Sequence, residues 1–220
     1  MSEHVTLNGP SFGPTSGGPA KQLVILLHGV GADGNDLIGL APVLAQVLPD
    51  AEFLSPNAPE PCDMAPVGYQ WFSLQDRSPE TLEAGVRAAA PLVDRYIDDN
   101  CTARDLTPDR VALFGFSQGC MMSLFVGLRR PSPLAAILGF SGTLVAPQKL
   151  TDEVVSRPPV LLVHGEADPV VPFQALAKAQ SELEAADVEV QALSRPGLGH
   201  GIDEEGIRAG AALLQRTLLG

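Results

Sequence analysis

Short runs of consecutive apolar residues recur along the chain, separated by stretches in which apolar residues lie three or four positions apart. Continuous runs of this kind are typical of strands buried on both faces, and the spaced pattern is typical of helices with one buried side. The runs predict strands over 23–27, 52–54, 111–114, 135–140, 160–163 and 188–193. The spaced pattern predicts helices over 33–48, 81–98, 121–128, 173–185 and 203–218, although Pro42 fits the first of these only within its first turns.

This alternation of strands and helices predicts the fold class α/β. Right-handed crossover connections place successive strands side by side in a mostly parallel sheet, with helices on both faces. No internal repeat or change of composition divides the chain, so we expect one catalytic domain over 21–220 after a flexible lead-in at 1–20 that is rich in Gly, Pro and Ser. The length of 220 residues leaves no room for a large cap domain.

The segment 56–75 is too long and too rich in proline for an ordinary connection, which predicts a surface loop with a function. It contains Trp71, the only tryptophan, and Tyr69, one of two tyrosines. A substrate-binding wall explains these aromatic residues better than core packing does. Aromatic residues that merely anchor the loop are the alternative.

Charge and cysteine content exclude several classes of protein. The 14 basic and 26 acidic side chains give a formal charge of −12, which disfavours binding to nucleic acid and stable association with anionic membranes. Three cysteines without metal-type spacing argue against a disulfide framework and suggest a reducing compartment. The first residues lack a signal-peptide pattern, and no apolar run approaches 18 residues, so we expect a soluble, cytoplasmic protein.

A candidate nucleophile, Ser117, lies in the sequence G-F-S-Q-G directly after the predicted strand 111–114. A nucleophile at the tip of a sharp strand-to-helix turn needs small residues two positions away on each side, here Gly115 and Gly119. The turn exposes the hydroxyl and places the Gln118 amide at a helix N-terminus, where a developing oxyanion is stabilised. A chance match in a chain with 22 glycines is the alternative, but the position after a buried strand favours the nucleophile.

A serine hydroxyl needs a general base, and the base needs an acid that orients it. His28 and His164 each follow an apolar strand, whereas His200 lies in the loop before the last helix. In the chain order serine, acid, histidine, only His200 is preceded by a well-placed acid, Asp168. Glu166 is the rival acid, and an aspartate that only caps the next helix is the alternative interpretation.

His28 precedes the serine and adjoins a glycine turn, so we expect it to hold that turn, with the Val30 amide as a second oxyanion donor. A zinc site formed by His28, His164, Asp168 and His200 is conceivable at one sheet edge. No H-x-x-H or H-E-x-x-H pairing supports it, so we expect neither a metal nor a cofactor.

Taken together, the motifs resemble the phospholipase/carboxylesterase family of α/β hydrolases, which includes acyl-protein thioesterases and small bacterial carboxylesterases. The similar segments are L-L-H-G-V-G at 26–31, G-F-S-Q-G at 115–119, H-G-E-A-D-P-V-V-P at 164–172 and G-H at 199–200. The resemblance implies an α/β-hydrolase domain in which Ser117 is the nucleophile, His200 the base and Asp168 its partner. It also implies an oxyanion hole formed by the amides of Val30 and Gln118.

The segment Y-Q-W-F-S-L at 69–74 is similar to the family's segment beside the pocket, with Ser73 where an acid is common, and Cys120 replaces a frequent glycine. These departures bear on pocket shape and leave the three catalytic candidates untouched. The expected reaction is hydrolysis of a small carboxylic ester or thioester through an acyl-enzyme. An acyl-protein thioesterase, a lysophospholipase, an acyltransferase and a non-catalytic binding module are the alternatives. Homodimers occur in the family.

Overall fold

The computed structural model describes residues 6–220, in which seven strands form one sheet in the order β1-β3-β2-β6-β7-β8-β9. Every neighbouring pair is parallel except β1, which runs antiparallel to β3 at one edge. The strands are β1 (Ser11–Phe12), β2 (Gln22–Leu27), β3 (Ala51–Leu54), β6 (Val111–Phe116), β7 (Ala136–Phe140), β8 (Val160–Gly165) and β9 (Val190–Arg195). The predicted α/β class and the mostly parallel sheet are confirmed, and the six predicted strands all form.

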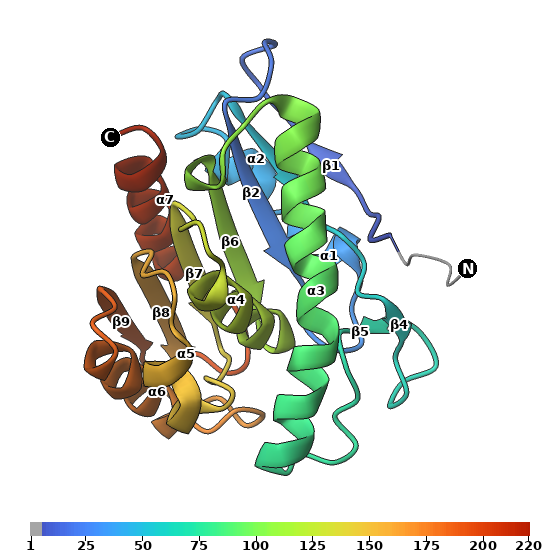
Figure 1. The fold of residues 1–220 in the computed structure, drawn as a ribbon, viewed down its shortest axis with the longest axis vertical. Helices are drawn as coiled ribbons and strands as arrows, with labels where there is room; N and C mark the ends of the chain where they lie inside the picture. Colours follow the sequence, from blue (N-terminus) through green and yellow to red (C-terminus); the bar gives the residue numbers. More distant parts are fainter. Residues whose placement is uncertain (1–5) are drawn as a thin grey trace.

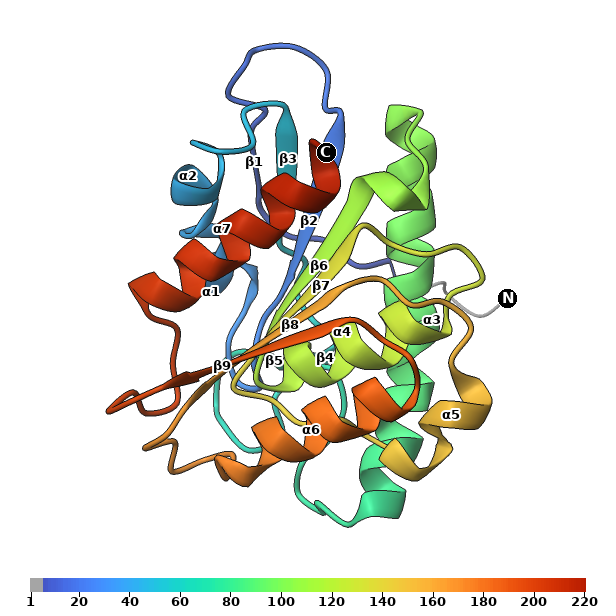
Figure 2. The same cartoon turned by 90° about the vertical axis from the view of Figure 1, so that its left-hand side faces the viewer.

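Helices cover both faces of this sheet, because alternate residues of the apolar strands point to opposite sides. In Figure 2, α1 (Gly34–Ile38), α2 (Ala41–Leu44) and α7 (Glu204–Leu218) lie on one side. The helices α3 (Pro79–Arg104), α4 (Gln118–Arg129) and α6 (Gln174–Ala185) lie on the other, which is the front face in Figure 1. Two layers of helices therefore enclose the strands and give each face its own apolar core.

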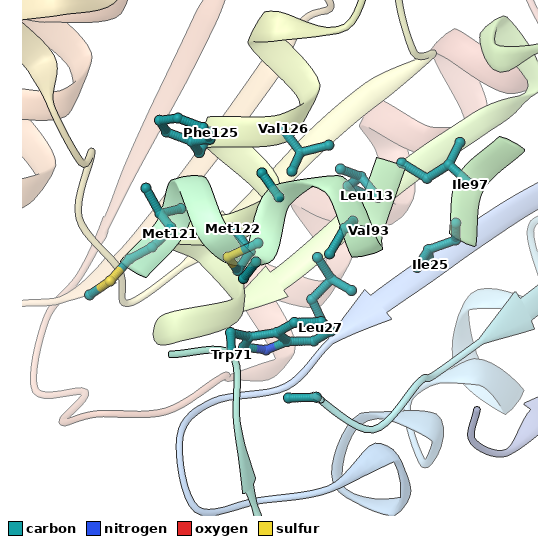
Figure 3. Packing of buried hydrophobic residues seen from close by; sticks show 14 of the residues in the cluster. Ile25, Leu27, Trp71, Val93, Ile97, Leu113, Met121, Met122, Phe125 and Val126 are labelled. Atoms are coloured by element: carbon teal, nitrogen blue, oxygen red, sulfur yellow. The ribbon is translucent and has the colours of Figure 1, made fainter. Parts of the chain in front are cut away.

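Strand β2 shows how the alternation divides the core. Ile25 and Leu27 pack beneath α3 and α4, against residues such as Val93 and Met122 (Figure 3). Val24 and Leu26 belong to the opposite core, with side chains of α1, α2 and α7. All five residues from Leu23 to Leu27 have no exposed surface. Complete burial on both faces explains why the strand reads as an uninterrupted apolar run.

Two predicted helices differ from the observed ones. The stretch 33–48 forms two short helices, α1 and α2, because Pro42 occupies the first turn of a helix, where its missing N–H leaves no gap in the hydrogen bonding. The stretch 81–98 is part of the longer helix α3, whose N-cap Ser78 accepts a hydrogen bond from the Thr81 amide. This helix ends at Asp105, which has a left-handed backbone with φ of 54°.

Several short elements have no counterpart in the apolar pattern. A hairpin of β4 (Glu60–Pro61) and β5 (Tyr69–Gln70) lies within the predicted loop, and α5 (Leu150–Glu153) follows a 3₁₀ turn at Pro147–Lys149. A second 3₁₀ turn, Pro108–Arg110, precedes β6. Strand β1 attaches part of the lead-in to the sheet edge, so residues 11–12 are ordered by pairing. The division into a flexible segment 1–20 and a domain 21–220 stays a prediction, and residues 1–5 lie outside the described range.

The described residues also bear on disulfides and membranes. Cys62, Cys101 and Cys120 are free thiols. Among residues 6–220, none of the helices combines the length and apolar character that a membrane span requires.

Candidate active site

Ser117 lies at the tip of the turn between β6 and α4, with φ of 53° and ψ of −114°. Its amide donates a 2.8 Å hydrogen bond to the Phe140 carbonyl of the neighbouring strand. The flanking glycines make this turn possible, because the strand and the helix touch there. A Cβ on Gly115 would lie 2.2 Å from the Gly119 carbonyl oxygen, and a Cβ on Gly119 would lie 1.8 Å from the Leu27 carbonyl oxygen.

The structure brings the three predicted catalytic residues together at the carboxyl ends of the parallel strands. Asp168 comes from the loop between β8 and α6, and His200 from the loop between β9 and α7. His200 Nε2 lies 3.0 Å from Ser117 Oγ, and His200 Nδ1 lies 2.8 Å from Asp168 Oδ2. Residues separated by 83 positions in the sequence thus form one hydrogen-bonded chain of side chains.

The Asp168 side chain is fully buried and accepts three hydrogen bonds. Its Oδ1 accepts the amides of Val170 and Val171 at 2.8 and 2.9 Å, while Oδ2 accepts from His200. Burial opposes ionisation, but these hydrogen bonds outweigh it and lower the pKa of Asp168 below 3.8. The carboxyl is therefore ionised at neutral pH and holds the hydrogen of His200 on Nδ1. The rival acid, Glu166, is exposed to solvent.

His28 fixes the direction of the predicted oxyanion donor Val30. The Ala58 amide donates to His28 Nε2 at 3.0 Å, so the neutral ring carries its hydrogen on Nδ1, which lies 2.7 Å from the Gly29 carbonyl oxygen. That carbonyl and the Val30 N–H belong to the same planar peptide unit, so a bond to one orients the other. Burial lowers the pKa of His28 below 6.5, although the Gly29 bond partly opposes this.

The second predicted donor, the Gln118 amide, belongs to the first residue of α4, where helical N–H groups have no partner within the helix. The Gln118 side chain has a separate role that sequence reasoning missed. Its Oε1 accepts the Trp71 amide at 3.0 Å, and its Nε2 donates to the Phe72 carbonyl at 2.6 Å. A buried side-chain amide that holds a distant backbone leaves no pattern in the sequence.

An apolar cavity of about 320 Å³ opens beside Ser117. Val30 and Met121 line it, together with residues of α3, α6 and the 170–172 turn. Its lining residues are Val30, Leu74, Arg77, Leu82, Ser117, Met121, Thr143, Val170, Val171, Pro172, Gln174, Ala175 and Lys178. A mostly apolar hollow next to a nucleophile suits the hydrocarbon part of a substrate.

The predicted wall residues Trp71 and Tyr69 do not line this cavity. Trp71 is 1% exposed and packs in the core beside Leu27 and Met122 (Figure 3), where its indole Nε1 donates to the His28 carbonyl at 3.0 Å. Tyr69 lies beside a different hollow, formed with residues 6–8 and 57–59. The hydrogen bonds to Gln118 and His28 turn Trp71 inward, so the loop contributes Leu74 to the cavity instead.

The remaining candidates have other environments. His164 is buried, with Nε2 3.0 Å from the Val171 carbonyl and 3.4 Å from Asp168 Oδ2, so it supports the turn that carries the aspartate. Burial raises the pKa of Cys120 to about 12, which keeps that thiol protonated. Within residues 6–220, no group of three or more His, Cys, Asp and Glu side chains is arranged to hold a metal ion.

Comparison with known proteins places these features in context. A family model described as Phospholipase/Carboxylesterase matches residues 14–218. The chain is 32% identical over 197 residues to acyl-protein thioesterase 1 of Schizosaccharomyces pombe, covering 84% of this chain and 86% of that protein. It is 29% identical over 200 residues to esterase YpfH of Escherichia coli, covering 91% and 84%. The crystal structure of esterase PE8 matches with a TM-score of 0.92 at 42% identity, covering 97% of this chain and 100% of that one.

Proposed function

Because the chain belongs to the phospholipase/carboxylesterase family of α/β hydrolases, we propose that it is a serine carboxylesterase that acts through an acyl-enzyme on Ser117. The observation that carries this proposal is the continuous path from Ser117 Oγ to His200 Nε2 at 3.0 Å and from His200 Nδ1 to Asp168 at 2.8 Å. An activated serine beside an apolar cavity fits carboxylic esters, and thioesters react by the same steps.

In the proposed reaction, His200 Nε2 accepts the Ser117 proton as the hydroxyl oxygen attacks the carbonyl carbon of the ester. The resulting oxyanion accepts hydrogen bonds from the Val30 and Gln118 amides, and each such donor is worth about 3 kcal/mol in the transition state. His200 then protonates the leaving alcohol or thiol. A water molecule repeats the sequence and frees the acid, while Asp168 keeps the imidazole oriented and stabilises its cationic form.

The decisive experiment replaces the nucleophile. We expect Ser117→Ala to lose at least about 10³-fold in kcat towards p-nitrophenyl butyrate, because the remaining groups cannot form an acyl-enzyme. Cys120→Ala is the matched control, since its buried thiol stays protonated, and it should retain activity. Near wild-type turnover by Ser117→Ala would overturn the proposal.

A second candidate, acyl-protein thioesterase, is favoured by the relatives that carry this name, among them the Schizosaccharomyces pombe protein. Comparison of a palmitoylated peptide with p-nitrophenyl esters of graded length separates the two functions. A fluorophosphonate probe that labels wild type but not Ser117→Ala distinguishes either enzyme from a non-catalytic binding module. The expected cytoplasmic location and possible homodimer stay predictions.

A further inference from the structure

The charge of the cavity beside Ser117 is opposite to that of the whole molecule. Acidic side chains outnumber basic ones by 26 to 14, yet the cavity lining contains Arg77 and Lys178 and no Asp or Glu. A second hollow of about 190 Å³ shares the lining residues Leu82, Thr143 and Lys178 with this cavity. The second lining also lacks acidic residues. The two linings together thus contain two cationic side chains and no acidic one, although the protein as a whole is acidic.

Neither cavity cation forms a salt bridge with any residue in 6–220. Arg77 donates only a long hydrogen bond, 3.4 Å, from its Nε to the Leu74 carbonyl. Arg87 and Lys149, in contrast, both form salt bridges with Glu83, at 2.8 and 2.6 Å. The acid nearest in sequence to Arg77 is Asp76.

The Asp76 carboxylate accepts its hydrogen bonds from Ser78 and Thr81, not from Arg77. It accepts hydrogen bonds from the amide and hydroxyl of Ser78 and from the Thr81 hydroxyl. Those bonds hold it within the turn that begins α3, and it does not line the cavity. The positive charge of Arg77 and Lys178 therefore remains free to meet a charge on a bound molecule.

We propose that the enzyme prefers esters that carry a second, ionised carboxyl group, which Arg77 and Lys178 bind while the ester carbonyl lies at Ser117. This inference rests on the proposed function and names its substrate class. The hydrocarbon between the two ends would contact apolar lining residues such as Leu82 and Met121. Arginine binds carboxylates through two parallel N–H groups, and lysine supplies a compact charge on a flexible stem.

Both cations are exposed, which sets the expected size and character of the effect. Exposed ion pairs change affinity by about two- to fivefold each, and salt screens them. The two cations together should therefore favour an anionic ester by roughly tenfold at low salt. They would also attract such a substrate against the overall charge of −12.

The carboxylate can belong to the acyl side or to the alcohol side of the ester, and two substrate pairs distinguish these sources. The acyl-side pair is the mono-p-nitrophenyl ester of adipic acid and p-nitrophenyl hexanoate. The alcohol-side pair is 4-hexanoyloxybenzoate and its methyl ester. Values of kcat and KM are measured for wild type, Arg77→Gln, Lys178→Gln and the double variant. Arg157→Gln is the control, because Arg157 also has no salt bridge within residues 6–220 but lies outside the cavity lining.

We expect each single cavity variant to raise the ratio of KM for the anionic ester to KM for the neutral ester by about two- to fivefold in one pair. The effect should shrink in 0.5 M NaCl, and Arg157→Gln should resemble wild type. Equal changes for anionic and neutral esters, or no change in either pair, would overturn the inference. Neutral-ester turnover that depends on Ser117 would still support the esterase, so the two proposals fail separately.

Discussion

At the scale of single residues, the backbone of Ser117 occupies a region that residues with a side chain rarely adopt, with φ of 53°. Such a conformation costs on the order of 1–3 kcal/mol and persists only where the surrounding structure imposes it. Here the bond to the Phe140 carbonyl and the close contact of two glycines impose it. In this conformation the hydroxyl oxygen lies 3.0 Å from His200 Nε2.

The environment of Asp168 predicts a severe effect of a nearly isosteric change. In Asp168→Asn, the side-chain oxygen can still accept from the Val170 and Val171 amides, so the turn should keep its shape. The amide nitrogen would donate a hydrogen bond to His200 Nδ1. The imidazole hydrogen would then lie on Nε2, so that nitrogen could no longer accept the Ser117 proton. We expect a loss of about 10⁴-fold in kcat with little change in melting temperature. Glu166→Gln, which alters the exposed neighbouring acid, should leave kcat unchanged.

His28 predicts a pH dependence of stability rather than of chemistry. Because burial holds its pKa below 6.5, the unfolded chain binds a proton more readily than the folded one between 6.5 and the lowered value. The contribution of neutral His28 to the free energy of unfolding is therefore complete above pH 6.5. It is lost as the pH falls towards the pKa that His28 has in the folded state. Urea unfolding between pH 7.5 and 5 should show this loss in wild type. A His28→Gln variant with the same slope would contradict the assignment.

Sequence reasoning selected three residues that the structure brings together, Ser117, Asp168 and His200, and their catalytic roles stay predictions. The spacing around Ser117 reflects contacts within one turn, and the order of Asp168 and His200 follows from the order of the strands. The prediction of a substrate-binding wall failed at Trp71, because the orientation of this residue is set by Gln118, 47 positions away. An aromatic residue in a proline-rich loop looks the same in sequence whether it faces a substrate or the core.

At the scale of elements, α4 starts in contact with the end of β2, and Gly119 allows that contact. We expect Gly119→Ala to lower the free energy of unfolding by about 1–3 kcal/mol, because its Cβ would overlap the Leu27 carbonyl oxygen. Gly39→Ala is the control, since its Cβ would lie 4.0 Å from the Asp36 carbonyl oxygen, an ordinary contact distance, and its φ is −60°. Urea denaturation of both variants measures the difference, and equal stabilities would refute the explanation.

The elements that sequence predicted well are those with a strong apolar signal. Strands buried on both faces, such as β6 and β8, read as continuous apolar runs and formed within two residues of their predicted bounds. Strands β1, β4 and β5 have two residues each, too few for any periodicity to show. The extra length of α3 depends on the cap at Ser78 and on packing that continues past Ile97 to Cys101.

At the scale of the whole molecule, the cavity lies where the helical layer over one face of the sheet meets the loops at its edge. Ala175 of α6 lines it, whereas Ala177 on the same helix is exposed. Ala175→Leu should reduce kcat/KM for p-nitrophenyl octanoate roughly tenfold or more relative to the acetate, because each methylene that a pocket accommodates is worth about 1–3 kcal/mol. Ala177→Leu should keep the wild-type chain-length profile. Identical profiles would show that acyl chains bind elsewhere.

The arrangement of the site also sets when during synthesis the enzyme becomes active. A growing chain on the ribosome contains the G-F-S-Q-G sequence at 115–119 well before the loop that carries His200 has been made. His200 follows 83 residues later, in the loop between the edge strand β9 and the last helix. The proposed nucleophile therefore remains without its base until translation has passed strand β9 and reached the loop that carries His200. Nascent chains stalled before that loop would carry the serine in an inert form.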